Sequence, residues 1–373
     1  MLAQTARLIL PHWFRRQLRR LRPHPAPKYA RLWAESCQKW CLSDVVREGK
    51  LLHASGWVIA PPELRSRIEF RINGQPATRV QYPIDRPDVA NHFPYVDYAA
   101  PSGFDIWADW PGDNKDVQLT VHDVRTGQPL GKDYAAWWVP AVTRSGPMPS
   151  GARIRRVIGQ ALEFNFRTGG LTTFHGLQSA LKKTLGKSFA DFPRVLDWGC
   201  GCARVARFVM NEPGVKLTGV DVDPDNVAWS GEHFPNADWQ TVPLRPPTLL
   251  PDGHFDLVYG ISVFTHLKEP DQNLWLDELR RVLRPGGVAL MTFHGPASIV
   301  WSRLNGERYR VLKQKGICDQ ENPIYDAQLT EADYYRDTFH TTEYVRKHWG
   351  EYFEIANVLP SAISHQDLVI MKK

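Results

Sequence analysis

The sequence predicts an α/β protein in which a small all-β sandwich precedes a larger unit built on a parallel sheet. Residues 43–145 show short alternating apolar runs separated by turn residues, a pattern typical of all-β domains. Residues 151–373 alternate apolar strands with helical patterns, which indicates a parallel sheet. A stretch rich in Gly and Pro at 146–151 separates the two parts, so we expect residues 151–373 to fold without the β-domain.

Composition excludes several classes of protein. Apolar residues make up 43% of the 373 residues and charged residues 23%, so neither a disordered nor a fibrous chain is expected. No run of about 18 apolar residues predicts a membrane-spanning helix. The five cysteines are too few, and odd in number, for a secreted disulfide framework. A cytoplasmic protein is therefore expected.

The net charge of +6 is concentrated near the start of the chain. Residues 1–34 carry eight basic side chains and no acidic one, which leaves a nearly neutral body without the basic groove that nucleic acid requires. Residues 1–42 are expected to form a basic amphipathic tail and a helix, the helix with an apolar stripe at Tyr29, Trp33, Cys37, Trp40 and Cys41. The tail predicts either peripheral contact of residues 1–27 with the inner face of a membrane or docking on the protein itself.

The β-domain is predicted from a succession of short strands. These are Leu51–Ala60, Arg67–Ile72, Ala77–Tyr82, Gly103–Trp110 and Val117–Val124. Asn73-Gly74 lies between the second and third of them and predicts a hairpin, because both turn positions of such a loop need positive φ. No acid pair or nucleophile arrangement in this part predicts catalysis.

Three short landmarks of the β-domain resemble a module that accompanies enzymes of bacterial surface-polysaccharide assembly. The landmarks are Gly56-Trp57, the run Arg86-Pro87-Asp88-Val89, and Gly103-Phe104. The resemblance implies an acceptor connected with polysaccharide biosynthesis. A β-domain that serves only for packing is the other interpretation.

The motif that carries the most chemical information begins at the apolar strand Val195-Leu196. Asp197-x-Gly199-x-Gly201 follows it as a tight turn into a helix, and the glycines let a ligand approach the backbone closely. A second strand at Lys216–Val220 ends in Asp221, at the position where a ribose-binding acid lies in a βαβ nucleotide cradle. The spacing thus predicts an adenosine-type cofactor. A dehydrogenase is disfavoured because the loop lacks the third glycine of the dinucleotide-binding pattern.

Four motifs in order resemble the class I S-adenosylmethionine-dependent methyltransferases of the small-molecule type. They are Asp197-Trp-Gly-Cys-Gly, Gly219-Val-Asp-Val-Asp, Phe255-Asp-Leu-Val with Ser262-Val-Phe-Thr-His-Leu, and Glu278-Leu-Arg-Arg-Val-Leu-Arg-Pro-Gly-Gly. The resemblance implies a Rossmann-like sheet of seven strands, with the last two, Tyr352–Leu359 and Asp367–Met371, as an antiparallel pair. It also implies S-adenosyl-L-methionine as cofactor, held by Asp197, Gly199, Cys200, Gly201, Asp221, Val222, Ile261 and Ser262. The chain departs from the family in having Ala203 as its third small residue and no acid after the third strand.

The implied reaction is methyl transfer to a hydroxyl of a glycan, a glycolipid or another small-molecule acceptor. A hydroxyl needs a base, and His266 follows the fourth strand, where ligands of open parallel sheets gather. A bracing role for this histidine is open as well, and His294 is a second candidate. An amino acceptor is disfavoured because Gly260-Ile-Ser-Val-Phe replaces the signature of amino-group methyltransferases. No metal site is predicted. The sequence gives no prediction of the oligomeric state.

Two further alternatives concern the acceptor side. The segment 310–348 is rich in Tyr, Asp, His and Lys, so it predicts either a cover over the substrate or a pair of surface helices. The rival function is a non-catalytic protein that binds S-adenosylmethionine and serves assembly in a surface-polysaccharide pathway.

Overall fold

The computed structural model describes residues 32–33, 39–131, 135–321, 331 and 334–373. The basic tail at 1–27 and two members of the predicted second helical stripe, Tyr29 and Cys37, lie outside the described residues. The helix expected there does not extend to Trp40 and Cys41, because both belong to the first strand of the β-domain. That strand begins three residues before the boundary expected at residue 43.

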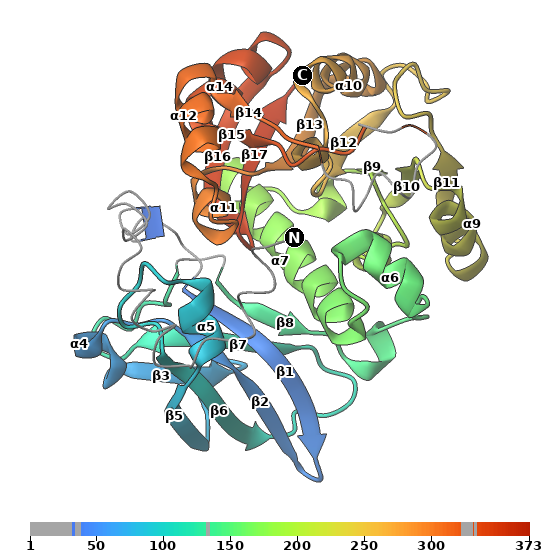
Figure 1. The fold of residues 1–373 in the computed structure, drawn as a ribbon. Coiled ribbons are helices and arrows are strands. Elements are labelled where there is room, and N and C mark those ends of the chain that lie inside the picture. The colour runs from blue at the N-terminus through green and yellow to red at the C-terminus, as the bar shows by residue number, and fades with distance from the viewer. Residues whose placement is uncertain (1–31, 34–38, 132–134, 322–330, 332–333) are drawn as a thin grey trace.

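The amino-terminal part is a sandwich of two antiparallel sheets, drawn in blue and teal in Figure 1. The strand orders are β1-β2-β6-β5 and β4-β3-β7-β8. The strands are β1 (Trp40–Glu48), β2 (Leu51–Val58), β3 (Ile68–Ile72), β4 (Gln75–Pro76), β5 (Arg79–Asp85), β6 (Pro101–Asp109), β7 (Val117–Asp123) and β8 (Trp137–Val139), with helices α4 (Pro62–Arg65) and α5 (Pro87–His92) between them. Leu52 and Ala54 of one sheet and Phe70 and Leu119 of the other share one buried cluster, which makes the two sheets a sandwich.

The predicted hairpin is confirmed at its turn but not along its second strand. Asn73 and Gly74 have φ of 50° and 79°, and β3 and β4 pair on either side of them. However, β4 has only two residues, after which the chain crosses to the other sheet and β5 pairs with β6. The strand expected at Ala77–Tyr82 is present from Arg79 as part of β5, but its pairing with β3 is wrong, because the second half of the hairpin is shared between two sheets.

The carboxyl-terminal part contains the predicted sheet of seven strands. They are β9 (Arg194–Trp198), β10 (Lys216–Asp221), β11 (Asp238–Thr241), β12 (Phe255–Gly260), β13 (Leu283–Phe293), β16 (Glu354–Ile363) and β17 (Gln366–Lys372). Their order is β11-β10-β9-β12-β13-β17-β16. The pairings among β9 to β13 are parallel, whereas β17 runs antiparallel to both β13 and β16. The predicted α/β fold and its closing antiparallel pair are confirmed.

Helices cover both faces of this sheet, so its central strands are apolar on both sides. Val195 and Leu257 face a cluster with Phe174 of α7, whereas Leu196 and Val258 face another cluster. The helices are α6 (Gly151–Ile158), α7 (Glu163–Leu185), α8 (Ala206–Val209), α9 (Pro224–His233), α10 (Glu269–Val282), α11 (Pro296–Trp301), α12 (Gly306–Lys315) and α14 (Thr342–His348), and a small sheet pairs β14 (Ile317–Cys318) with β15 (Phe339–His340). None of the helices in the described part of the chain is long and apolar enough to cross a membrane.

The two parts of the chain pack against each other along an apolar interface. Trp301 at the end of α11 stacks on Trp57 of β2, with ring centroids 6.0 Å apart. The hydroxyl of Tyr95 donates to the carbonyl of Val300 at 3.0 Å. Beside α7, which Figure 1 shows next to β8, Trp138 stacks on His175 with centroids 3.7 Å apart. Independent folding of residues 151–373 stays a prediction, and the fragment would expose this interface.

Candidate functional site

A pocket opens at the carboxyl ends of β9, β10 and β12, where loops of the parallel strands converge. We call it the sheet-edge pocket. It is lined by the candidate base His266 and by all eight residues expected to hold the cofactor, namely Asp197, Gly199, Cys200, Gly201, Asp221, Val222, Ile261 and Ser262. The strand order brings these side chains together although their positions span about seventy residues of the chain.

Two glycines of the loop after β9 have a backbone conformation and close neighbours that leave no space for a side chain. Gly199 has φ of 78°, and a Cβ there would lie 2.4 Å from Cγ2 of Val263. Gly201 has φ of 50°, and a Cβ there would lie 2.8 Å from Cγ2 of Val157. The N–H groups of Gly199 and Cys200 both donate to the carbonyl of Val220, at 2.8 and 3.0 Å. The loop is therefore bound to β10, and its glycines leave the pocket floor bare.

Asp221, the last residue of β10, is held by the backbone on both of its carboxylate oxygens. Oδ2 accepts from the N–H of Gly201 at 2.7 Å, and Oδ1 accepts from the N–H of Asp223 at 2.9 Å. Burial raises the pKa of Asp221, and the two N–H donors oppose that shift. Each oxygen keeps a second lone pair, so the carboxylate is positioned to accept two further hydrogen bonds from a ligand.

Asp197, at the start of the glycine loop, is a buried acid with a phenol partner. Its Oδ2 accepts from the hydroxyl of Tyr259 on the neighbouring strand β12 at 2.8 Å. Burial raises the pKa of Asp197 to about 7, although the hydrogen bond from Tyr259 works against the shift. A cationic group of a ligand in the pocket would stabilise the charged form of this acid.

The two cysteines of the loop are not nucleophiles. Burial raises the pKa of Cys202 to about 12 and that of Cys200 well above its ordinary value. Both thiols are therefore protonated at neutral pH, and the thiolate is the reactive form. Cys200 instead packs over β10, since a Cβ at Gly219 would lie 3.2 Å from its sulfur.

Ser262 forms the far wall of the pocket in an unusual conformation. Its φ of 62° places it in the left-handed region. Its N–H donates to Oγ1 of Thr292 at 2.7 Å, and its hydroxyl lies 2.8 Å from Nε2 of Gln366. Contacts from two other strands thus hold the turn after β12 and fix where its side chains point.

His266 lies four residues further along, and a carbonyl fixes its tautomer. Nδ1 lies 3.0 Å from the carbonyl of Arg336, and since a carbonyl only accepts, Nδ1 carries the proton. The neutral ring then has its lone pair on Nε2. Burial lowers the pKa of His266, and the contact with the Arg336 carbonyl opposes the shift. The histidine is therefore neutral at physiological pH, which is the form a base requires.

His294, the second histidine considered, is not among the residues that line the sheet-edge pocket. It is buried behind Gln366, with the two Nε2 atoms 3.5 Å apart, and its ring lies against Phe339. Burial lowers the pKa of His294 well below its ordinary value. Its position after β13 places it against Phe339, His365 and Gln366 rather than on the pocket wall, so the structure gives no support to His294 as a base for a ligand in this pocket.

Two lining residues, Arg156 and Val157 of α6, were not anticipated from the sequence. Tyr334 and Tyr335, which also line the pocket, belong to the segment expected either to cover the substrate or to form surface helices. Nε of Arg156 lies 3.0 Å from Oδ2 of Asp223, so α6 is joined across the pocket to the loop after β10. Segment 310–348 thus contributes two tyrosines to the pocket and also contains α14 and most of α12, so its role as a cover over the substrate stays a prediction.

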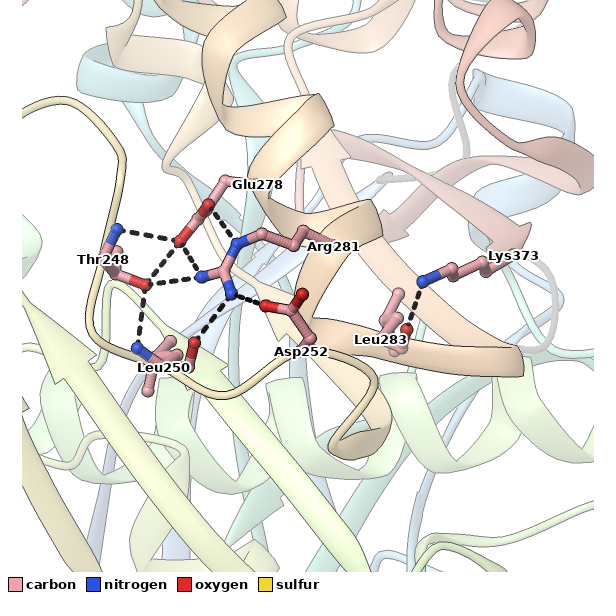
Figure 2. A network of polar contacts seen from close by, with 7 residues as sticks. All are labelled: Thr248, Leu250, Asp252, Glu278, Arg281, Leu283 and Lys373. Carbon is pink, nitrogen blue, oxygen red and sulfur yellow. Dashed lines mark hydrogen bonds and ion pairs between the residues drawn. The ribbon is translucent and has the colours of Figure 1, made fainter.

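A partly buried polar network joins α10 to the loop after β11, as Figure 2 shows. The carboxylate of Glu278 on α10 accepts from the N–H of Thr248 at 2.9 Å and from Nη2 of Arg281 at 2.7 Å. Arg281 also donates to the carbonyl of Leu250 at 2.9 Å and pairs with Asp252. Burial opposes ionisation of Glu278, but these donors lower its pKa. The network fixes the loop that begins with Val242, a residue on the pocket wall.

Comparison with known proteins agrees with this geometry. Residues 195–287 match the family model described as a methyltransferase domain. The chain is 31% identical over 99 residues to a 2-methyl-6-phytyl-1,4-hydroquinone methyltransferase of Synechocystis, covering 26% of this chain and 30% of that protein. It is 33% identical over 99 residues to a trans-aconitate 2-methyltransferase of Azoarcus, covering 26% and 38%. The match thus spans less than half the length of these relatives.

Among solved structures, the chain is similar to a 1,6-didemethyltoxoflavin-N1-methyltransferase of Burkholderia thailandensis that was crystallised with S-adenosylhomocysteine. The identity is 16% and the TM-score 0.38, over 64% of this chain and 95% of that one. The observed strand order, with its antiparallel seventh strand, and the family match over β9 to β13 lead to one conclusion about architecture. The carboxyl-terminal part of this chain has the class I S-adenosylmethionine-dependent methyltransferase fold.

Proposed function

We propose that the protein is an S-adenosylmethionine-dependent methyltransferase that acts on a hydroxyl of a small-molecule or glycan acceptor. The observation that carries the proposal is the convergence of Asp221, the glycine loop and His266 on one pocket at the carboxyl edge of the sheet. In this proposal the acid and the glycine loop bind the adenosine part of the cofactor, and the neutral histidine accepts the proton of the acceptor hydroxyl.

The residues present fit the cofactor. Positive φ at Gly199 and Gly201, with close neighbours where each Cβ would lie, gives a loop that a ligand can approach closely. The Asp221 carboxylate, anchored by two N–H groups, has lone pairs for the two ribose hydroxyls. When bound, S-adenosylmethionine supplies an electrophilic methyl group on a sulfonium. Catalysis by the chain then consists largely of holding the acceptor in line with that methyl group.

His266 is the proposed base. The carbonyl of Arg336 keeps the proton on Nδ1, so Nε2 is the atom that takes the acceptor proton. Tyr335 contacts the ring edge to face with centroids 5.7 Å apart and lies on the same pocket wall, where an acceptor would meet both. Aromatic walls suit the apolar faces of sugars and of ring compounds alike.

The identity of the acceptor as a glycan or glycolipid rests on the landmarks of the β-domain. Arg86, one of them, pairs with Asp88 at 2.7 Å and donates to the carbonyl of Gly56 at 3.3 Å. A Cβ at Gly103 would lie 2.8 Å from Cγ of Arg86, so all three landmarks form one packing unit. The landmarks are thereby explained by packing, and polysaccharide biosynthesis belongs to the proposal through the resemblance alone.

Substitution of the histidine tests the proposed chemistry. His266→Gln retains a donor and much of the shape but has no titrating nitrogen. With labelled S-adenosylmethionine and an extract that contains acceptors, we expect the variant to bind S-adenosylhomocysteine normally and to transfer methyl groups about 100-fold or more slowly. The acidic limb of the pH–rate profile, which lies below the ordinary pKa of 6.5 because burial lowers it, should vanish. Normal turnover by the variant would make His266 a brace rather than a base.

The same assay distinguishes methyl transfer from the rival function, which is cofactor binding without turnover. A wild-type protein that binds S-adenosylhomocysteine but transfers no label to any extract, soluble or lipid-bearing, would favour an assembly role.

A further inference from the structure

The tautomer of His266 depends on the position of one carbonyl, and that carbonyl belongs to a segment outside the large sheet. Nδ1 of His266 lies 3.0 Å from the carbonyl of Arg336, whose own N–H donates to the carbonyl of His266 at 2.9 Å. Two residues further on, the N–H of Thr338 donates to the carbonyl of Thr265 at 2.9 Å. Residues 336–338 therefore run along the turn that carries His266, and a shift of Arg336 would remove the acceptor that fixes the tautomer.

A short ribbon holds the other side of this segment. β14 and β15 pair over two residues each, and beyond them Gln320 and Asp337 exchange two backbone hydrogen bonds, at 3.3 and 2.8 Å. A last bridge joins Glu321 to Arg336. A two-stranded ribbon of this size is only marginally stable by itself. Side-chain contacts at its end therefore help to decide whether Arg336 stays in place.

Asp319, which directly follows β14, makes such a contact with the side chain of Arg336. Nε of Arg336 lies 2.6 Å from Oδ2 of Asp319, whereas Nη1 lies 4.0 Å from Oε1 of Glu321. The side chains of Arg336 and Asp319 are 16% and 33% exposed, and that of Glu321 is 72% exposed. A partly buried ion pair contributes little net stability, because the cost of desolvation offsets much of the attraction between the charges. Its directional effect remains, since a short charge-assisted hydrogen bond fixes the guanidinium relative to the ribbon.

We propose that Asp319 is a positioning residue for methyl transfer, which holds Arg336 so that the Arg336 carbonyl keeps the ring proton of His266 on Nδ1. As the acceptor oxygen bonds to the methyl carbon and the bond from that carbon to sulfur breaks, the hydroxyl proton passes to the free Nε2. The inference rests on the proposed function. Asp319 is not among the described residues that line the sheet-edge pocket, so its effect runs through Arg336 and His266.

Nitrogen NMR of isotopically labelled histidine rings reads the tautomer without any substrate. In the wild-type protein the ring signals of His266, identified as those lost in His266→Gln, should show the proton on Nδ1 alone. Asp319→Ala should give averaged signals of both tautomers, because the acceptor at Nδ1 is no longer fixed. Asp319→Glu, which keeps the charge, should restore the wild-type signals.

Glu321→Ala is the matched control, because it removes a carboxylate of the same ribbon that lies 4.0 Å from Arg336. It should leave the ring signals unchanged. Wild-type ring signals in Asp319→Ala would overturn the proposal. If Asp319→Ala does not fold, Asp319→Asn, which keeps the shape without the charge, takes its place in this measurement and in the next.

Kinetics then connect the tautomer with the reaction. With labelled S-adenosylmethionine and an extract that contains acceptors, Asp319→Ala should lower the maximal rate about 10- to 100-fold at an unchanged KM for the cofactor. Asp319→Glu should recover most of the rate, and Glu321→Ala should keep it. A reduced rate with an unchanged tautomer would refute the positioning role. A wild-type protein that transfers no methyl group would contradict the proposed function, whereas the ring signals test the contact of Asp319 without turnover.

Discussion

Replacement of Asp221 gives the sharpest separation between ligand binding and folding at the site. The carboxylate accepts two backbone N–H groups, at 2.7 and 2.9 Å, and in the proposed complex also two ribose hydroxyls. Asp221→Ala removes all four. Loss of the hydroxyl contacts should weaken binding of S-adenosylhomocysteine by about 2–4 kcal/mol, as for a bidentate hydrogen bond to a charged group. The dissociation constant should then rise about 30- to 900-fold.

Folding should respond less than binding does. The N–H groups of Gly201 and Asp223 lie at the pocket, where water can replace the lost acceptor. We therefore expect the free energy of unfolding of Asp221→Ala to be about 1–2 kcal/mol lower than that of the wild type. Asp221→Asn keeps one acceptor oxygen and should lie between the wild type and Asp221→Ala in both quantities. Asp238→Ala, an exposed acid at the start of β11, is the control for loss of one negative charge. Calorimetry and urea unfolding measure the two effects, and a folded Asp221→Ala protein with wild-type affinity would refute the reasoning.

Three further outcomes follow from the geometry. Gly199→Ala should destabilise the fold by about 1–3 kcal/mol, because φ at Gly199 is 78° and Val263 lies where the new methyl group would be placed. Adding Val263→Ala to this variant should recover the part of the loss that is due to the clash. An unchanged melting temperature of Gly199→Ala would contradict this. Asp197→Asn should alter the pH dependence of unfolding. The pKa of Asp197 in the folded protein, about 7, lies above its ordinary value of 3.8, so the wild type loses stability relative to the variant as the pH rises from 3.8 to 7. The same dependence of the free energy of unfolding on pH in both proteins, measured by urea unfolding, would contradict this. Trp301→Ala should lower the free energy of unfolding by about 2–4 kcal/mol through loss of the stack on Trp57. The affinity for S-adenosylhomocysteine should stay within about 3-fold of the wild-type value. A large loss of affinity would show that the interface shapes the pocket.

The parts of the fold that were predictable are those with a local signal. The strand β9, the glycine loop and Asp221 follow one another along the chain, and a βαβ unit fixes their relative placement. The closing pair β16 and β17 was also recognisable, because two apolar runs lie on either side of a short turn. These elements depend on neighbours in sequence, so the pattern of residues is enough to place them.

The unpredicted parts depend on contacts between distant segments. Arg156 reaches the pocket from α6, about forty residues before the glycine loop, and the segment around α6 has no motif of its own. Tyr335 is positioned because the N–H of Arg336 donates to the carbonyl of His266 at 2.9 Å. The crossing from β4 to β5 between sheets likewise depends on pairing with separate partner strands, β3 for β4 and β6 for β5.

A crystal structure with S-adenosylhomocysteine tests the central claim most directly. The account predicts the ligand in the sheet-edge pocket, with both ribose hydroxyls within hydrogen-bonding distance of the Asp221 carboxylate and the sulfur atom facing His266. A ligand bound elsewhere, or one in this pocket with its ribose away from Asp221, would contradict it.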